Sequence, residues 1–330
     1  MKSKGTIIQN LFNAFGWNTK RKIILFESDD WGSIRVPSSK VKGLLLDKGI
    51  SLNSLSYNCY DSLASEEDLA FLFDVLLKVK DIRGNPAKFT VNTVVANPDF
   101  DKIKESNFTK YYFEPFTVTL KRYPEHQKSF ELWKEGMAAG VFKPQFHGRE
   151  HLNVTRWMEA LYNNSGHTRL AFDYRMFDLS TSLTPSENSF MEALNYIEHN
   201  ELRFHQNSLI EGTELFEKIF GYKSTSFIAP CYMWSNDLNH TLRKCGIRVF
   251  QGGIFQFQPT GGRFKKAIHY TGQKNALGQY FLVRNVSFEP SENPSFDWVG
   301  SALSQIANAF LWHTPAIIST HRMNYIGYID

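Results

Sequence analysis

Short runs of β-branched and aromatic residues recur along the whole chain, and amphipathic segments lie between them. Turn-forming residues bound each run, so we predict eight strands. They cover residues 22–28, 88–95, 141–147, 169–174, 225–230, 247–251, 279–286 and 316–321. The segments between them show helical periodicity at 65–80, 208–220, 235–245 and 297–310.

The ends of the predicted helices carry ordinary helix signals. The helix at 65–80 opens with Ser65 and acidic residues and closes with lysines, as the helix dipole prefers. The helices at 208–220 and 235–245 both end before a glycine. These signals support the helical interpretation of the segments between the strands.

Strands that alternate with helices predict parallel βα units, and about eight of them favour an α/β fold with a closed or nearly closed (β/α) barrel. An open doubly wound sheet remains the alternative. The 330 residues suffice for one large domain. We predict a single domain over 1–330 with insertions near 99–126 and 178–201.

Composition narrows the class of protein. The 37 Lys and Arg residues against 33 Asp and Glu give a net charge of +4 without a run of like charges, so no nucleic-acid partner is indicated. The three cysteines show no C-x-x-C spacing. Neither a signal peptide nor an apolar run of about 18 residues is present. These observations predict a cytoplasmic protein without a transmembrane segment.

Polar residues follow several of the predicted strands. The first strand ends in E-S-D-D-W-G, which contains Asp29 and Asp30. Barrel enzymes collect their chemistry at the carboxyl ends of strands, where one carboxylate can bind a metal while the other accepts a proton. A turn-forming aspartate pair before a glycine is the alternative interpretation.

A second motif, H-G-R-E-H, places His147 and His151 four residues apart. On a helix or a tight helical turn, both imidazoles would project from one face and could share a metal ion such as zinc. A structural or solvated histidine pair is the alternative.

Two weaker signals lie further along the chain. His321 follows the last strand in I-I-S-T-H-R, and Pro230 and Tyr232 follow another strand in F-I-A-P-C-Y-M-W. Each could be a packing residue with a hydrogen bond. Together they make four polar groups at four strand ends.

The order of these motifs resembles the polysaccharide deacetylase family, which is carbohydrate esterase family four with the NodB-like homology domain. The similarity rests on the D-D pair, the H-x-x-x-H pair, the P-x-Y segment, the F-D-W segment and the final histidine. It extends from about Ile23 to Tyr325. The resemblance implies a distorted (β/α) barrel of about seven or eight strands.

The resemblance also implies roles for individual residues. Asp29 would be the catalytic base and His321 the general acid. Asp30, His147 and His151 would bind the metal, usually zinc. The backbone amide of Tyr232 would stabilise the oxyanion, and Asp297 with Trp298 would orient the acid. Trp31, Tyr232 and Trp298 are expected to line the substrate site.

The implied activity is the metal-dependent removal of acetyl groups from N-acetylated or O-acetylated carbohydrate. A metal held by two histidines and one carboxylate keeps open positions and can activate water. An acetylated carbohydrate or glycan precursor is the expected partner. The sequence gives no oligomeric state.

The sequence departs from the family pattern at several places, among them Cys231, which replaces the second proline of the P-x-Y segment. Trp31 is inserted before the glycine, and Glu27 replaces a small hydroxyl residue. The arginine that pairs with the catalytic aspartate in the family is Ala229 here. We predict that Arg149, Arg322 or Arg35 replaces its charge.

Two other functions remain open. The sequence H-G-R-E-H also fits the inverted zinc-peptidase motif H-x-x-E-H, in which Glu150 would be the general base. Gly148 and the strand-like residues before it argue against the long helix that this motif needs. A barrel without the arginine could instead be a catalytically impaired carbohydrate-binding or scaffold protein.

Overall fold

The computed structural model of the chain describes residues 10–50, 52, 60–177, 179 and 190–326. Within them, eight strands form one sheet, in the order β10-β7-β6-β5-β2-β1-β12-β11, and all its pairs are parallel. The strands are β1 Ile24–Trp31, β2 Phe89–Thr93, β5 Phe142–Phe146, β6 Ser226–Ile228, β7 Val249–Gly252, β10 Tyr280–Val283, β11 Val286–Ser287 and β12 Ala316–His321. The predicted α/β fold with a parallel sheet is confirmed.

The two edge strands of this sheet are consecutive in the chain. Only Arg284 and Asn285 separate β10 from β11. The amide of Arg284 still donates to Gly252 O of β7 at 2.9 Å, whereas the amide of Asn285 donates to Ile317 O of β12 at 3.1 Å. One run of chain therefore changes neighbours and joins the two ends of the sheet into a distorted barrel. We call residues 280–287 the barrel seam.

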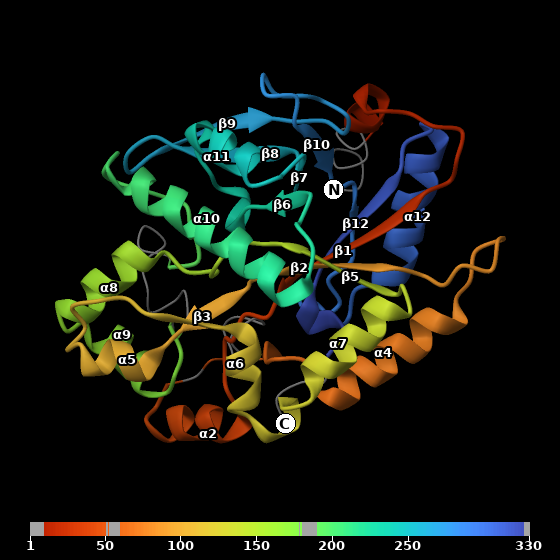
Figure 1. Cartoon of the computed structure of the whole chain (residues 1–330). Helices are drawn as coiled ribbons and strands as arrows, with labels where there is room; N and C mark the ends of the chain where they lie inside the picture. The colour runs from red at the N-terminus through yellow and green to blue at the C-terminus, as the bar shows by residue number, and fades with distance from the viewer. Residues whose placement is uncertain (1–9, 51, 53–59, 178, 180–189, 327–330) are drawn as a thin grey trace.

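Helices surround the strands (Figure 1). They are α2 Ser39–Asp47, α4 Glu66–Lys78, α5 Phe100–Glu105, α6 Phe116–Lys121, α7 Ser129–Ala138, α8 Val154–Tyr162, α9 Gly166–Asp173, α10 Glu201–Phe220, α11 Asn239–Lys244 and α12 Trp298–Leu311. Short 3-10 turns cover Pro124–His126, Pro230–Tyr232, Asn236–Leu238 and Arg322–Asn324. No helix among the described residues is long and apolar enough to cross a bilayer.

Two antiparallel hairpins extend from the barrel. Strand β3 (Ala96–Pro98) pairs with β4 (Phe113–Pro115), and β8 (Phe255–Pro259) pairs with β9 (Phe264–Ile268). The first hairpin, with α5 and α6, makes up most of the insertion predicted near 99–126. Of the insertion predicted at 178–201, residues 178 and 180–189 lie outside the described residues.

An aromatic cluster fills the space between the sheet and the helices α4 and α7. Trp31 is 0% exposed, and its ring packs edge-on against Trp133 at 5.8 Å and Phe142 at 5.1 Å between centroids. Its indole Nε1 donates to Ser28 Oγ at 2.8 Å. The expectation that Trp31 lines the substrate site is therefore wrong, because the ring is entirely enclosed in the core.

One predicted strand is a helix. Residues 169–174 lie largely in α9, Gly166–Asp173. The buried positions of α9 are Thr168, Ala171 and Phe172, whose spacing of three and four residues follows the helical period rather than the alternation of a strand. The short apolar run R-L-A-F-D-Y did not distinguish the two periods.

Candidate active site

A bulge at the end of β1 brings two adjacent carboxylates to one site. Ser28 is paired with Val91 of β2, but Trp31 is paired with Thr93, so β1 contains one extra residue. Asp30 has φ of 68°, in the left-handed region that aspartate tolerates better than most residues. Side chains normally alternate across a strand. The bulge breaks this alternation, so Asp29 and Asp30 both reach buried polar partners.

Arg284 of the barrel seam holds Asp29. Its Nη1 lies 2.6 Å from Asp29 Oδ2 and its Nη2 lies 2.6 Å from Oδ1, a bidentate pair. Asn92 of β2 also donates to Oδ1 at 2.8 Å. Burial alone would raise the pKa of Asp29, but the charge and hydrogen bonds of Arg284 hold it below its usual value. Asp29 is therefore a carboxylate at neutral pH.

Glu27 shares the same guanidinium. Its Oε2 accepts from Arg284 Nε at 2.8 Å, and its side chain is fully buried. Burial raises the pKa of Glu27 to about 7, against the opposing charge of Arg284. The glutamate that departs from the family pattern is thus the second partner of the arginine that holds Asp29, the predicted base.

Three candidate metal ligands converge on the other side of the bulge. Among the described residues, Asp30, His147 and His151 offer ligand atoms that all lie within 4.8 Å of one another, and all three are buried. Asp30 Oδ1 lies 3.2 Å from His147 Nε2 and 3.6 Å from His151 Nε2. The predicted trio is brought together, although the residues are far apart in sequence.

The histidine pair does not lie on a helix. His147 follows the end of β5, Gly148 has φ of 105°, and the next helix, α8, begins at Val154. A loop brings the two rings to 5.2 Å between centroids. The expectation of a helical face is therefore wrong, because the positive φ of Gly148 turns the chain out of a helical path.

The donor set fits a divalent metal ion. The ring of His147 lies 2.9 Å from Ile228 O through Nδ1. A carbonyl only accepts, so Nδ1 carries a proton, and in the neutral form of the ring the Nε2 lone pair would point toward Asp30 Oδ1. Two acceptors that face each other at 3.2 Å suit a cation between them. Burial lowers the pKa of His151 to about 3, so the ring of His151 is neutral at pH 7.

His321 lies at the end of β12, in register with Asp29 of β1. Its Nδ1 lies 2.8 Å from Glu289 Oε1. Burial would lower the pKa of His321, but the hydrogen bond and negative charge of Glu289 raise it to about 9. Asn324 donates to the other oxygen of Glu289 at 2.6 Å and so fixes that carboxylate. His321 is therefore protonated at neutral pH.

Glu289, and not Asp297, orients this histidine. Asp297 caps α12, because its Oδ1 accepts from Gly300 N at 2.8 Å. Trp298 is the first residue of that helix, and its Nε1 donates to Asn293 O at 3.0 Å. The predicted role of Asp297 is wrong for this chain, since its carboxylate serves the helix end. Glu289 follows the predicted strand 279–286 by three residues, a signal that the sequence did contain.

Tyr232 is close to the site through its side chain. Its hydroxyl lies 3.3 Å from Arg284 Nη1, and its φ is 55°. Its backbone amide donates to Ala229 O at 2.9 Å within a tight turn. The predicted oxyanion role of this amide is not met in this structure, because the N–H already has an acceptor.

The three arginines predicted to replace the missing charge pair with other acids. Arg35 Nη2 lies 2.9 Å from Asp30 Oδ2, and Arg322 Nη2 lies 2.6 Å from Asp61 Oδ1. Arg149 binds both oxygens of Glu150 at 2.6 Å. Arg284 fills the role instead. An arginine inside the apolar run F-L-V-R-N-V was the signal for a buried acidic partner.

The same contacts argue against a zinc peptidase. Glu150 is buried and bidentate with Arg149, so it does not face the candidate metal ligands as a general base would. The motif also lies in a loop rather than in the long helix that the H-x-x-E-H arrangement requires.

Comparisons with known proteins found no matching family model and no matching curated protein. Solved structures do match. A putative polysaccharide deacetylase from Mycobacterium smegmatis shares 11% identity over 93% of this chain and 82% of its own, with a TM-score of 0.39. IcaB from Ammonifex degensii shares 12% identity over 70% of this chain and 84% of its own, with a TM-score of 0.33.

A protein of another activity matches as well. The 4-alpha-glucanotransferase from Thermococcus litoralis shares 9% identity over 91% of this chain, with a TM-score of 0.41, and this chain spans 34% of its length. Structural similarity at these identities and TM-scores does not identify an activity. A proposal for the function must therefore be based on the geometry of the site. Several polysaccharide deacetylases are nevertheless among the solved structures to which this chain is similar.

Proposed function

We propose that this protein is a metal-dependent hydrolase that removes acetyl groups from acetylated carbohydrate, in particular N-acetylated sugars. One observation carries the proposal: a candidate metal trio is flanked by an ionised acid, Asp29, and a protonated histidine, His321. Pairs of titratable groups with opposite protonation states at one site are typical of general base and general acid.

Asp30, His147 and His151 would hold the ion, for which zinc suits the two imidazoles and one carboxylate. When bound, a divalent ion supplies a Lewis acid that polarises the acetyl carbonyl and makes water more acidic. Arg35 pairs with Asp30 Oδ2, which leaves Oδ1 to face the two histidines.

Asp29 supplies the base. The attacking water transfers a proton to its carboxylate, and a carboxylate oxygen that accepts one hydrogen bond from Arg284 can accept another. Arg284 keeps Asp29 ionised and fixes its orientation through two bonds. The bulge at Asp30 gives the two carboxylates separate roles, because Asp30 faces the cation site while Asp29 faces Arg284.

His321 supplies the acid. Protonated through Glu289, it gives its proton to the departing sugar nitrogen, so that the C–N bond breaks with loss of a neutral amine. The products are acetate and an amino sugar. An O-acetyl ester would break in the same way, with the proton passing to the sugar oxygen.

The scaffold alternative rested on the missing arginine. Arg284 supplies an arginine that holds Asp29 by a bidentate contact, which favours the enzyme over the scaffold. The arginine comes from a different strand than the family pattern predicts, but the acid that it holds is the same.

Acetate release tests the proposal. The protein is assayed on N-acetylated and O-acetylated amino sugars and their oligomers, with Zn²⁺ and with a chelator, beside the variants Asp29→Asn and Asp237→Asn. Asp237 is an exposed control on the surface turn Asn236–Leu238. We expect release that the chelator abolishes and Asp29→Asn lowers by about 10²–10⁴-fold, whereas Asp237→Asn matches wild type. No release from any substrate by metal-loaded protein would refute the proposal.

A further inference from the structure

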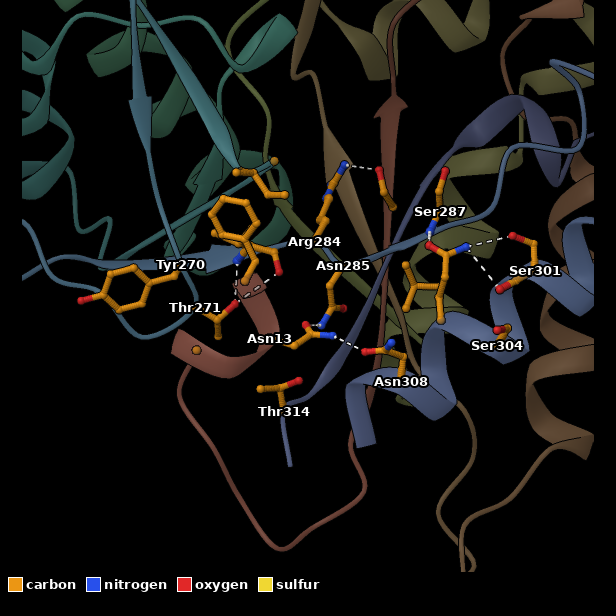
Figure 2. Close-up of a pocket in the computed structure, with 18 of the residues that line it drawn as sticks. Asn13, Tyr270, Thr271, Arg284, Asn285, Ser287, Ser301, Ser304, Asn308 and Thr314 are labelled. Carbon is orange, nitrogen blue, oxygen red and sulfur yellow. Dashed lines mark hydrogen bonds between the residues drawn. The ribbon is translucent and has the colours of Figure 1, made fainter. Parts of the chain in front are cut away.

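A large, open cavity lies beside the barrel seam. Its volume is about 920 Å³, and residues of the seam, α12 and the helical segment 10–15 line it (Figure 2). Binding sites for small molecules typically measure about 300–1,000 Å³. The cavity is therefore large enough for a ligand well beyond an acetyl group.

Amides and hydroxyls line the cavity. Asn13 forms a chain of amides, since its Oδ1 accepts from Asn285 at 2.9 Å and its Nδ2 donates to Asn308 at 3.1 Å. These bonds tie the helical segment 10–15 to the seam and to α12, so the wall is fixed. The hydroxyls of Ser301 and Ser304 of α12 face the same hollow (Figure 2). These polar groups can hydrogen-bond the hydroxyl groups of a ligand that also has apolar faces.

The cavity offers no unpaired positive charge. Its charged lining residues, among those described, are Arg284 and Asp297. The guanidinium of Arg284 is paired with Asp29 and Glu27, and the exposed carboxylate of Asp297 caps α12. An anionic ligand would therefore be desolvated without an opposite charge. The lining disfavours an anionic ligand.

Aromatic rings stand at the cavity. Tyr270 is 40% exposed and Phe296 is 48% exposed, and both line it. Aromatic side chains that are half in contact with water provide flat apolar faces beside polar groups. Together with the hydroxyl and amide lining, such faces match the apolar face and hydroxyl rim of a sugar ring.

The cavity adjoins the candidate active site at Arg284. Tyr232, Arg284 and Ser319 all line it, and Arg284 Nη1 lies 3.3 Å from the Tyr232 hydroxyl and 3.2 Å from Ser319 Oγ. The same Nη1 binds Asp29. None of the three candidate metal ligands lines the cavity. It therefore adjoins the base side of the site.

We propose that this cavity binds a non-anionic carbohydrate chain that continues from the acetylated sugar past Asp29, so that oligomers bind better than monomers. The inference rests on the proposed function for the identity of the reacting sugar. The seam explains the location, because the chain changes neighbours at Arg284 and Asn285 and the cavity opens where β10 gives way to β11.

The test fills the cavity from α12. Ser304 is exposed and lines the cavity, whereas the adjacent Leu303 is 61% exposed and does not. The variants Ser304→Trp and Leu303→Trp are therefore matched. Acetate release is measured on N-acetylglucosamine and its β-linked oligomers up to the hexamer. We expect Ser304→Trp to lower the ratio of kcat/KM for tetramer to that for monomer by about tenfold. Leu303→Trp keeps the wild-type ratio.

A binding measurement separates this inference from the proposed function. Calorimetric titration of metal-loaded Asp29→Asn protein with the tetramer gives the affinity of the tetramer without turnover. Binding that Ser304→Trp or Phe296→Ala weakens, without acetate release by the parent, supports the cavity and refutes the activity. Release with equal kcat/KM for all chain lengths, or a preference that survives in Ser304→Trp protein of unchanged melting temperature, refutes the cavity and leaves the activity in place.

Discussion

Arg284 binds Asp29 through two parallel contacts of 2.6 Å each, across a separation of 255 residues in the chain. A buried carboxylate would otherwise take up a proton near neutral pH. This one contact, made from the barrel seam, keeps the proposed base ready to accept a proton from water.

Replacing Arg284 by Met should raise the pKa of Asp29, because burial then acts without an opposing charge. We expect the acid limb of the pH profile of kcat/KM to move up by about 1–3 units. The loss of Arg284 leaves the buried carboxylates of Glu27 and Asp29 without a cation. This should also lower the free energy of unfolding by about 3–5 kcal/mol. A pH profile and urea unfolding at pH 7 measure both effects.

The matched control is Arg322→Met. Arg322 is equally buried, but it pairs with Asp61. That variant should lose stability and keep the acid limb of the wild type. An equal shift of the acid limb in both variants would mean that Arg284 has no specific effect on Asp29.

Glu27 should make stability depend on pH between about 4.5 and 7. Its pKa rises to about 7 in the folded protein, so the folded state binds more protons than the unfolded state in this range. Stability from this group is therefore present at low pH and is lost as the pH rises through 7. The loss is on the order of 3 kcal/mol, at about 1.4 kcal/mol per pKa unit.

The variant Glu27→Gln removes the titration and keeps an acceptor for Arg284 Nε. Unfolding free energies of wild type and variant, measured in urea at pH 5 and pH 7.5, give the difference attributable to this group. The variant should gain relative to wild type at the higher pH. A difference between the two proteins that stays constant with pH would contradict the prediction.

Glu289→Gln should lower the pKa of His321 from about 9, because the hydrogen bond and charge that raise it are weakened while burial continues to lower it. We expect the basic limb of the pH profile to fall by about 2 units. The wild-type histidine stabilises the fold below its ordinary pKa, and this contribution is lost as the pH rises through 9. NMR titration of the His321 ring measures the pKa directly.

Asp297→Asn decides between the two candidate orienting acids. The change keeps a capping oxygen for α12 and removes the charge that the family pattern assigns to the acid. The ring of His321 should titrate as in wild type. A fall of its pKa in Asp297→Asn, with none in Glu289→Gln, would restore the assignment made from the sequence.

The protein should bind one divalent ion through Asp30, His147 and His151. At a free Zn²⁺ concentration 100 times the dissociation constant, binding should stabilise the fold by about 2.7 kcal/mol. Calorimetric titration of wild type, His151→Ala and His126→Gln measures the stoichiometry. His126 is buried elsewhere, near Ala64, so its variant should bind as wild type does. Retained stoichiometric binding in His151→Ala would exclude this site.

The sequence predicts a barrel strand well where the hydrophobic pattern clearly fits a strand rather than a helix. The last strand is predicted at 316–321 and lies at Ala316–His321. It also predicts which residues meet at the strand ends, because parallel strands bring their carboxyl ends to one edge. The convergence of Asp30 with His147 and His151 follows from that rule.

Two features of the site could not be predicted from the sequence, because they depend on local backbone conformation and on pairing between distant residues. The bulge that separates the roles of Asp29 and Asp30 depends on a positive φ that no residue type dictates. The partner of Asp29 depends on which arginine the barrel closure brings close. We expected Arg149, Arg322 or Arg35 instead of Arg284, whose place inside an apolar run indicates a buried acidic partner but not which acid it is.

Both hydrogen-bonding edges at the barrel seam are covered. Residues Gly272 and Gln273 return antiparallel to β10, where their backbone groups bond Phe281 at 2.9 Å, and the side chain of Gln305 accepts from Ser287 N of β11 at 3.1 Å. Uncovered strand edges are templates on which other chains add strands and aggregate. The seam pairs first with β7 and then with β12, and this change of partner closes the barrel. Among these residues, no strand edge is left open to intermolecular strand addition.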